Sequence, residues 1–299
     1  MDWNDFLSEH GTSSRLQVGV VGCGRAGSVL GAALQRAGHR VVAVSAVSDA
    51  SRERAGRLLP AATVQRPQHV VDAADLVLLT VPDDVLPALV EGLSWRPGQL
   101  VAHASGRHAL AVLRPAAGVL PLALHPALPL HGADDDVARL TGAAFGVTSP
   151  EVLRPIAEAL VLEMGGEPVW LTETDRPLWH AALAHGANHL VTLVASVADL
   201  LRQAGAQDPA AVLGPLLTAA LDGALHRGDA ALTGPVSRGD AGTVAAHLAV
   251  LPDDVRPAYL ALARLTADRA LASGRLTAAK AEPLLDVLSE TVLRRPATP

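Results

Sequence analysis

Residues 16–27 read LQVGVVGCGRAG, an apolar run followed at once by three glycines in a G-x-G-x-x-G arrangement. The segment after it, SVLGAAL, has the apolar spacing of a helix. A strand, this glycine turn and a helix, in that order, form the fingerprint of a dinucleotide-binding domain. Gly22 permits the tight turn, Gly24 lets the backbone approach a pyrophosphate, and Gly27 lets the helix and strand pack closely. The sequence therefore predicts a cofactor site at Gly22, Gly24, Arg25, Ala26 and Gly27; the alternative is a glycine-rich turn that binds nothing.

The composition is that of a chain with a sizeable core. Of its 299 residues 49% are hydrophobic and 18% charged, which excludes a disordered chain. The net charge of −6 and the lack of a basic cluster argue against nucleic acid as a partner. The single cysteine, Cys23, allows no intramolecular disulfide and fits a reducing compartment, so we expect a cytoplasmic protein. No 18-residue apolar run lacks a charge or a breaker, so no membrane partner is expected.

The chain has two halves with different patterns. Up to residue 172, short apolar runs alternate with helical segments, which predicts a Rossmann-type, doubly wound and mainly parallel α/β sheet. The expected strands are 16–21, 40–47, 76–81, 100–103, 119–124, 143–147 and 169–171, and the expected helices between them are 26–37, 51–59, 84–93 and 150–164. We therefore expect a loose tail at 1–14, a dinucleotide-binding domain at 15–172, an all-helical domain at 173–293 and a tail at 294–299.

The helical half begins with a long apolar segment. Residues 175–204 read as one helix that is apolar on most faces, and helices over about 208–227, 241–250, 254–273 and 277–293 follow. A helix of this kind is buried, commonly against a second subunit. We therefore expect a homodimer built on the helical domain, which would also carry substrate-binding residues.

The ends of two predicted strands bear on the cofactor. The second strand is followed by Ser48, with Arg52 close behind, and hydroxyl and guanidinium groups there would accept the 2′-phosphate of NADP. Asp49 argues for the ribose 2′-OH of NAD instead, or caps the next helix. We expect NADP rather than NAD, with Val81 and Pro82 at the end of the third strand beside the nicotinamide ribose.

Polar residues also follow the next two predicted strands. His103 and Ser105 stand in VAHASG, and His125 stands in LALHPA. Because ligands bind at the carboxyl ends of such strands, these residues are candidates to line a substrate. A metal site that includes His108 and His131 is the alternative, but the spacing matches no tight ligand motif, so no metal is expected.

The long apolar helix carries several polar side chains. His180, Ala184 and Asn188 are spaced i, i+4 and i+8, so they share one face. A buried His or Asn needs hydrogen-bond partners. One interpretation is an internal hydrogen bond or a subunit contact; the other is that His180 and Asn188 face the cofactor and bind a substrate oxygen or nitrogen.

Residues 232–243, LTGPVSRGDAGT, read as a polar loop between two apolar helices. A plain connector does not need so many polar side chains together, although that interpretation stays open. Arg238 could hold a carboxylate by a bidentate contact, and Asp240 could cap the next helix. We count Thr233, Arg238 and Asp240 among the candidate substrate residues.

The chain resembles the Rossmann-like proteins whose helical second domain is a domain of unknown function. The stretches that carry the resemblance are VGVVGCGRAG, DLVLLTVPD, HASG, LHPALPL, HAALAHGAN and, most specifically, LTGPVSRGD with TVAAHL after it, and they cover about residues 16–290. That family is similar to 6-phosphogluconate dehydrogenase, ketopantoate reductase and pyrroline-5-carboxylate reductase. The resemblance implies NADP binding, a dimer through the helical domain and a small-molecule substrate, with ketopantoate as the first substrate to test.

The sequence departs from these relatives at the expected proton donor. Ketopantoate reductases and hydroxyacid dehydrogenases place a lysine four residues before the helix asparagine, where this chain has Ala184. The relatives also place an arginine at the end of the second strand, where this chain has Val47. His180, one turn before Ala184, is the candidate substitute acid because histidine titrates near neutral pH. The leading hypothesis is an NADPH-dependent reductase of a small oxo-acid or imine; the alternative is a non-catalytic NADP-binding or sensing protein.

Overall fold

The computed structural model describes residues 15–293, so the two predicted tails lie outside the described residues. The chain divides into two compact units, one ending at His189 and the other beginning at Leu190. The sheet belongs entirely to the first unit, whose last strand ends at Trp170. The domain boundary near residue 173 thus stays a prediction, since the chain passes between the units inside a long helical segment.

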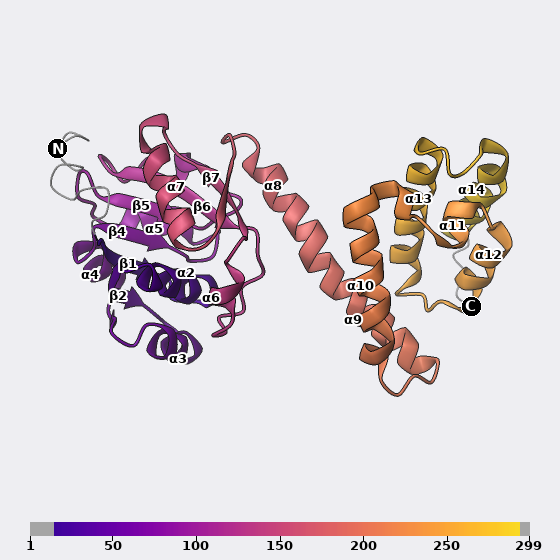
Figure 1. Cartoon of the computed structure of the whole chain (residues 1–299), viewed down its shortest axis with the longest axis horizontal. Helices are drawn as coiled ribbons and strands as arrows, with labels where there is room; N and C mark the ends of the chain where they lie inside the picture. The colour runs from indigo at the N-terminus through magenta and orange to yellow at the C-terminus, as the bar shows by residue number, and fades with distance from the viewer. Residues whose placement is uncertain (1–14, 294–299) are drawn as a thin grey trace. The chain divides into compact units, whose positions relative to one another are not determined.

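The first unit is built on one eight-stranded sheet with helices on both faces (Figure 1). In chain order the strands are β1 Gln17–Val21, β2 Arg40–Ser45, β3 Thr63–Val64, β4 Leu76–Leu79, β5 Leu100–His103, β6 Leu120–Pro126, β7 Ala144–Thr148 and β8 Glu167–Trp170. They lie side by side in the order β3-β2-β1-β4-β5-β6-β7-β8. Every neighbouring pair is parallel except β6–β7, which is antiparallel. The predicted Rossmann-type, mainly parallel sheet is confirmed.

The helices of this unit fall between the strands. They are α2 Arg25–Arg36, α3 Asp49–Leu58, α4 Pro67–Asp72, α5 Leu86–Gly92, α6 Asp136–Arg139, α7 Arg154–Glu163 and α8 Arg176–Leu183, with 3-10 turns η1 Leu110–Leu113 and η2 Glu151–Leu153. Strand β3, helices α4 and α6 and the 3-10 turn η1 were not expected from the sequence. The other strand and helix ends differ from the expected ones by a few residues, most visibly in β6, which continues through His125 and Pro126.

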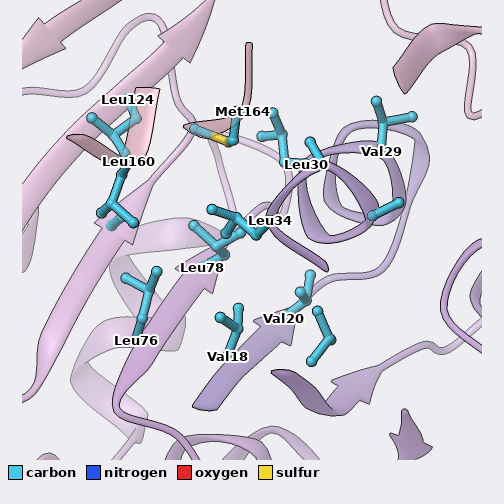
Figure 2. Close-up of a cluster of buried hydrophobic side chains, with 14 of the residues drawn as sticks. Val18, Val20, Val29, Leu30, Leu34, Leu76, Leu78, Leu124, Leu160 and Met164 are labelled. Atoms are coloured by element: carbon cyan, nitrogen blue, oxygen red, sulfur yellow. The ribbon is translucent and has the colours of Figure 1, made fainter. Parts of the chain in front are cut away.

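The central strands read as continuous apolar runs because both faces of the sheet are covered. Val18, Val20, Leu76 and Leu78 point to one face and pack against Leu30, Leu34, Leu160 and Met164 of α2 and the α7 region (Figure 2). Val77, Leu79 and Val101 point to the other face, where they pack with α4, α5 and η1. This double burial fixes the register of the strands, and it aligns their carboxyl ends along one edge.

The segment predicted as one helix over 175–204 is continuous but not uniform. Helix α8 passes into a π-helical turn, η3 Ala184–Asn188, and then into α9 His189–Gln203. Within the single chain none of the residues of α9 is buried, and burial of this segment against a second subunit stays a prediction.

The second unit is helical, as predicted. After α9 come α10 Pro209–Arg227, η4 Gly228–Ala231, α11 Gly234–Arg238, α12 Ala241–Val250, α13 Arg256–Ala272 and α14 Ala278–Leu293. The core of this unit is formed by residues of α11 to α14, among them Val244, Ala267 and Leu284. The segment 232–243 was expected to be a loop, but the structure places helix α11 inside it.

Candidate active site

The glycine loop joins β1 to α2 and is held by hydrogen bonds to the ends of two neighbouring strands. Gly22 has a φ of +93°, a conformation that glycine adopts without strain. Its N–H donates to the Ser45 hydroxyl at 2.9 Å, and its carbonyl accepts from the Thr80 hydroxyl at 2.8 Å. The Cys23 N–H donates to the Ser45 carbonyl at 2.7 Å. The ends of β2 and β4 therefore fix the turn before any ligand binds.

The three glycines have different surroundings. A Cβ on Gly27 would lie 2.5 Å from the Gly22 oxygen and 3.0 Å from Val20 Cγ1, so the close approach of α2 to β1 requires glycine. A Cβ on Gly24 would meet only the Gly22 oxygen, at 3.9 Å. The protein itself therefore does not need glycine at position 24, whereas a ligand approaching the backbone there would need it.

The start of α2 offers groups that a pyrophosphate could use. The first amides of a helix have no carbonyl partner within it, and the helix dipole adds a partial positive charge at this end. In α2 these are the amides of Arg25, Ala26 and Gly27, and the Arg25 side chain is exposed beside them. The open space at Gly24 and this helix terminus fit a dinucleotide. Cys23 below them is buried, and burial raises the pKa of its thiol to about 11 despite the charge of Arg54, so it is not a reactive thiol.

The candidate residues for the adenosine end lie on the surface after β2. The Ser48 hydroxyl accepts from the Ser51 N–H at 3.2 Å and caps α3, and Arg52 pairs with Asp49 at 2.7 Å with both side chains largely exposed. Val81 lies close to the other side of the glycine loop, since a Cβ on Gly22 would come within 2.8 Å of its Cγ1. Pro82 follows it and is exposed.

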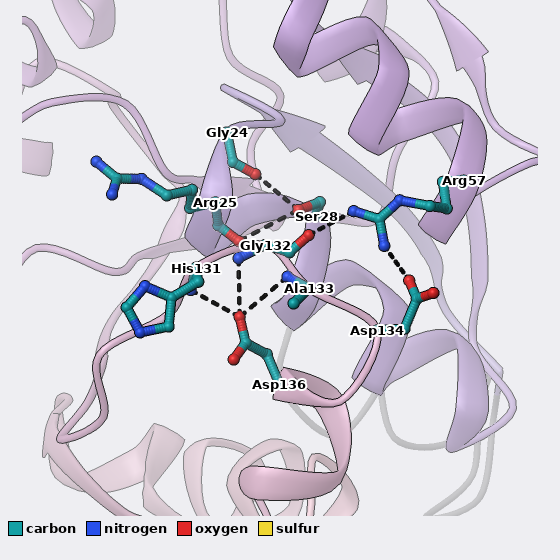
Figure 3. A network of polar contacts seen from close by, with 9 residues as sticks. All are labelled: Gly24, Arg25, Ser28, Arg57, His131, Gly132, Ala133, Asp134 and Asp136. Carbon is teal, nitrogen blue, oxygen red and sulfur yellow. Dashed lines mark hydrogen bonds and ion pairs between the residues drawn. The ribbon is translucent and has the colours of Figure 1, made fainter. Parts of the chain in front are cut away.

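The loop after β6 lies against the glycine loop (Figure 3). The buried Asp136 carboxylate accepts hydrogen bonds from the backbone N–H groups of His131, Gly132 and Ala133 at 2.6, 2.8 and 3.1 Å. Burial alone would raise the pKa of Asp136, but these three donors outweigh it and lower the pKa. A Cβ on Gly132 would come within 3.3 Å of the Arg25 Cα, so the loop is shaped to the start of α2. The sequence analysis did not identify Asp136, and only the acidic run DDD pointed to it.

Arg176 attaches helix α8 to the edge of the sheet. Its side chain is fully buried. The guanidinium donates to the backbone oxygens of Ser105, His108 and Gly146 at 2.6, 2.8 and 3.3 Å and to the Thr148 hydroxyl at 3.1 Å. Burial lowers the pKa of Arg176 to about 10, against the opposing carboxylates of Asp83 and Glu173, so it is still charged at neutral pH. These contacts hold the start of α8 in place, so that the side chains after Arg176 on this helix lie over the end of β6.

A small hollow lies where α8 and η3 cross the end of β6, with a volume of about 120 Å³. We call it the histidine hollow; its walls include His125, Leu128, His180, Leu183, Ala184 and Asn188. The prediction that His180, Ala184 and Asn188 share one face is confirmed. The His125 and His180 rings meet edge to face, with 5.5 Å between their centroids. Part of the wall is the π-helical turn η3, a feature common at functional sites.

Two further candidates are not brought into the histidine hollow. The His103 side chain is fully buried, and neither of its ring nitrogens has a hydrogen-bond partner of ordinary geometry among residues 15–293. Burial first, and then the charge of Arg176, lower its pKa to about 3. The Ser105 hydroxyl accepts from the N–H groups of Arg107 and His108 and so shapes its own loop. The prediction that His103 and Ser105 line the substrate is therefore wrong for the histidine hollow.

The candidates of the second unit gather around α11. Thr233 and Arg238 line a hollow that also includes Ser237 and Arg275. Asp240 instead accepts from the Thr243 hydroxyl and N–H at 2.7 and 3.0 Å and caps α12, and these hydrogen bonds lower its pKa. The capping role considered for Asp240 is thus observed. Within the part of the chain that the structure describes, no three His, Cys, Asp or Glu side chains are arranged to hold a metal ion.

Family models match most of the chain in two parts. Residues 5–126 match a Rossmann-like domain, and residues 143–266 match a domain of unknown function, DUF2520. The second match begins at the last two strands of the sheet and continues into α13. The chain thus resembles a Rossmann-like domain followed by DUF2520, and each match covers less than half of the chain. None of the curated proteins compared with the chain matches it.

Solved structures share the fold at low sequence identity. A putative NADP oxidoreductase from Bacteroides fragilis is 21% identical with a TM-score of 0.71, over 85% of this chain and 98% of its own. 1-Pyrroline-5-carboxylate reductase from Streptococcus pyogenes is 15% identical with a TM-score of 0.58, over 92% and 99%. An imine reductase from Pseudomonas sp. is 20% identical with a TM-score of 0.58, over 87% and 95%. At these identities the likeness establishes the fold, while the chemistry has to be argued from the residues.

Proposed function

We propose that this chain is an NADPH-dependent reductase of a small oxo-acid or imine, of the ketopantoate reductase-like kind. The observation that carries the proposal is that the glycine loop and the histidine hollow lie at the carboxyl ends of strands of one sheet. In doubly wound sheets this edge binds the cofactor and its substrate. The names of the similar structures, which include an imine reductase and a pyrroline carboxylate reductase, support the same class of reaction.

The roles follow from the chemistry of each residue. The amides of Arg25, Ala26 and Gly27 would hold the pyrophosphate, and the Ser48 hydroxyl and the Arg52 guanidinium would bind the 2′-phosphate that distinguishes NADP from NAD. The cofactor supplies a hydride. His180 would donate the proton that the substrate oxygen or nitrogen needs, and the Asn188 amide would orient the same atom. Thr233 and Arg238 carry hydroxyl and guanidinium groups that could donate hydrogen bonds to a carboxylate.

The experiment is a screen of NADPH oxidation with ketopantoate, other 2-oxo-acids and cyclic imines. We expect saturable oxidation with one of them and weaker use of NADH. Saturable NADPH binding without turnover of any of these compounds would contradict the reductase proposal. That result would favour the non-catalytic NADP-binding or sensing protein, for which the structural argument is Ala184, an aliphatic side chain where related reductases have their lysine.

We also propose that the protein is a homodimer built on α9 and α10. Both helices expose large apolar side chains, including Val191 at 70% on α9 and Leu216 at 59% and Leu225 at 75% on α10. The proposal is that these side chains form one apolar patch, since such patches normally mark an interface. The segment Arg176–Gln203 also has the length and composition of a membrane-crossing helix. We favour a second copy of the chain as its partner, in a reducing compartment such as the cytoplasm.

The dimer proposal predicts a particle of twice the 30.7 kDa chain mass in light scattering at micromolar concentration. Val191→Glu together with Leu216→Glu should give a monomer, because charges would then enter an apolar interface. Val250→Glu is the matched control, since Val250 is 80% exposed on α12 and lies outside these helices. A monomeric wild-type protein, or one that sediments with lipid vesicles, would contradict the proposal.

A further inference from the structure

Trp179 lies beside His125 and contacts one particular ring nitrogen. The indole Nε1 of Trp179 and Nδ1 of His125 are 3.1 Å apart. An indole N–H only donates, so the His125 nitrogen that it meets has to be an unprotonated acceptor. A neutral imidazole carries one proton, and that proton is then on Nε2.

The position of the indole is fixed by the backbone around it. Gly146 of β7 stands opposite His125 of β6 in the antiparallel pair. A Cβ on Gly146 would come within 2.8 Å of the Trp179 Nε1, so the absence of a side chain there leaves room for the indole. Arg176, at the start of the same helix, is held by four hydrogen bonds to the sheet edge and to the loop after β5. The indole is therefore placed by rigid elements.

The other edge of the His125 ring carries Nε2 and lies beside Gly106. No residue among those that the structure describes forms a hydrogen bond with Nε2, and His125 is part of the hollow wall. A Cβ on Gly106 would lie 2.8 Å from this nitrogen and 2.7 Å from His180 Cδ2, so the glycine keeps this corner open between the two rings. The Nε2–H group is thus free to donate to a ligand.

The charges around His125 keep its ring neutral. Burial lowers its pKa to about 4, and the neighbouring His180 and Arg176 act in the same direction, while Asp83 opposes them. His103, which is close enough to interact with His125, carries no charge at neutral pH, since its own pKa is about 3. At neutral pH the ring therefore offers a hydrogen bond and has no proton to transfer as an acid.

We propose that Trp179 is a positioning residue that holds His125 as a neutral Nε2–H donor, and that this donor selects a substrate with an acceptor atom, a carbonyl oxygen, over a protonated imine. The selectivity rests on the proposed reductase function. In the reduction, hydride adds to the carbonyl carbon, the C=O π electrons take a proton from His180 to form the hydroxyl, and His125 keeps its proton throughout. A protonated imine would turn its own N–H against that of His125, and two donors facing each other are unfavourable.

The first test uses NMR to observe which nitrogen of the His125 ring is protonated, and it does not require turnover. In long-range ¹H–¹⁵N spectra of histidine-labelled protein at pH 7, His125, assigned with His125→Gln, should show a protonated Nε2 and an unprotonated Nδ1. Trp179→Phe keeps an aromatic ring and removes the donor. Because a hydrogen bond to the neutral form disfavours the charged one, the His125 titration midpoint should rise by about one pH unit in that variant. Trp170→Phe is the control, since Trp170 lies on β8 and stacks with Arg154.

The outcomes separate this inference from the reductase proposal. A proton on Nδ1 of His125 in the wild type, or the same titration midpoint in wild type and Trp179→Phe, would overturn the positioning role. The second test compares substrates: Trp179→Phe should raise KM for the oxo-acid about 5-fold with kcat less affected, as expected for one weakened hydrogen bond. Equal kcat/KM for an oxo-acid and a cyclic iminium would overturn the selectivity. The expected spectra without any turnover would support the positioning role and contradict only the reductase.

Discussion

A Gly24→Val protein is expected to fold normally and to lose NADPH binding by more than about 100-fold, the equivalent of two lost hydrogen bonds to a charged phosphate. Gly24 has a φ of −80° and a ψ of −152°, at the margin of the extended region, and its negative φ does not by itself demand glycine. Its Cβ would meet only the Gly22 oxygen, at 3.9 Å, so the fold has room for the new side chain. The valine would fill the space through which a pyrophosphate approaches the start of α2. Titration calorimetry gives the affinity, and circular dichroism and thermal melting establish that the variant is folded.

Two other glycines serve as comparisons for the Gly24→Val substitution. Gly92→Val is the matched control, because Gly92 ends α5 with nothing within 4 Å of its missing side chain, and it should bind NADPH like the wild type. Gly27 is unsuitable as a probe, since a Cβ there would meet the Gly22 oxygen at 2.5 Å and disturb the loop itself. A folded Gly24→Val protein with unchanged affinity would show that the glycine loop is not the phosphate site.

The parts of the fold that the sequence predicts are those with one dominant physical cause. A parallel strand covered on both faces has to be a continuous apolar run, so β1, β4 and β5 stand out in the sequence. Strand β3 has only two residues and pairs only with Ala43 and Val44 at the edge of the sheet, and α4 has six residues. Neither is long enough for a periodic pattern, so tertiary contacts determine both.

Helix α11 could have been found from its end signals. Pro235 lies in its first turn and Gly239 follows it with a left-handed φ of +73°, the usual pair of start and stop residues. The polar character of 232–243 led to the loop prediction instead. The error shows that composition is a weaker guide to a five-residue helix than its capping residues.

The candidate site was predictable in outline because strand ends meet at one edge. That rule places the glycine loop and His125 on the same side of the sheet, and helical spacing places His180 with Asn188. The roles of Trp179 and Gly146 were not predictable, because they depend on β7 running antiparallel to β6 and on which face of α8 meets it. The burial of His103 likewise follows from the loop that covers it, and nothing in VAHASG indicates how that loop folds.

His180→Ala is expected to lower turnover by about 10²–10⁴-fold, the usual cost of losing a general acid, while NADPH binding stays unchanged. His180 lines the histidine hollow and has no part in the glycine loop, so a binding loss is not expected. Asn188→Ala should mainly raise KM, because an orienting amide is lost and the acid remains. His69→Ala, an exposed histidine on α4, should keep wild-type turnover. His103 and His125, with pKa values of about 3 and 4, carry no transferable proton at neutral pH. Turnover within a few fold of the wild type in His180→Ala would therefore exclude His180 as the acid and favour a bound water over His103 and His125 as the proton source.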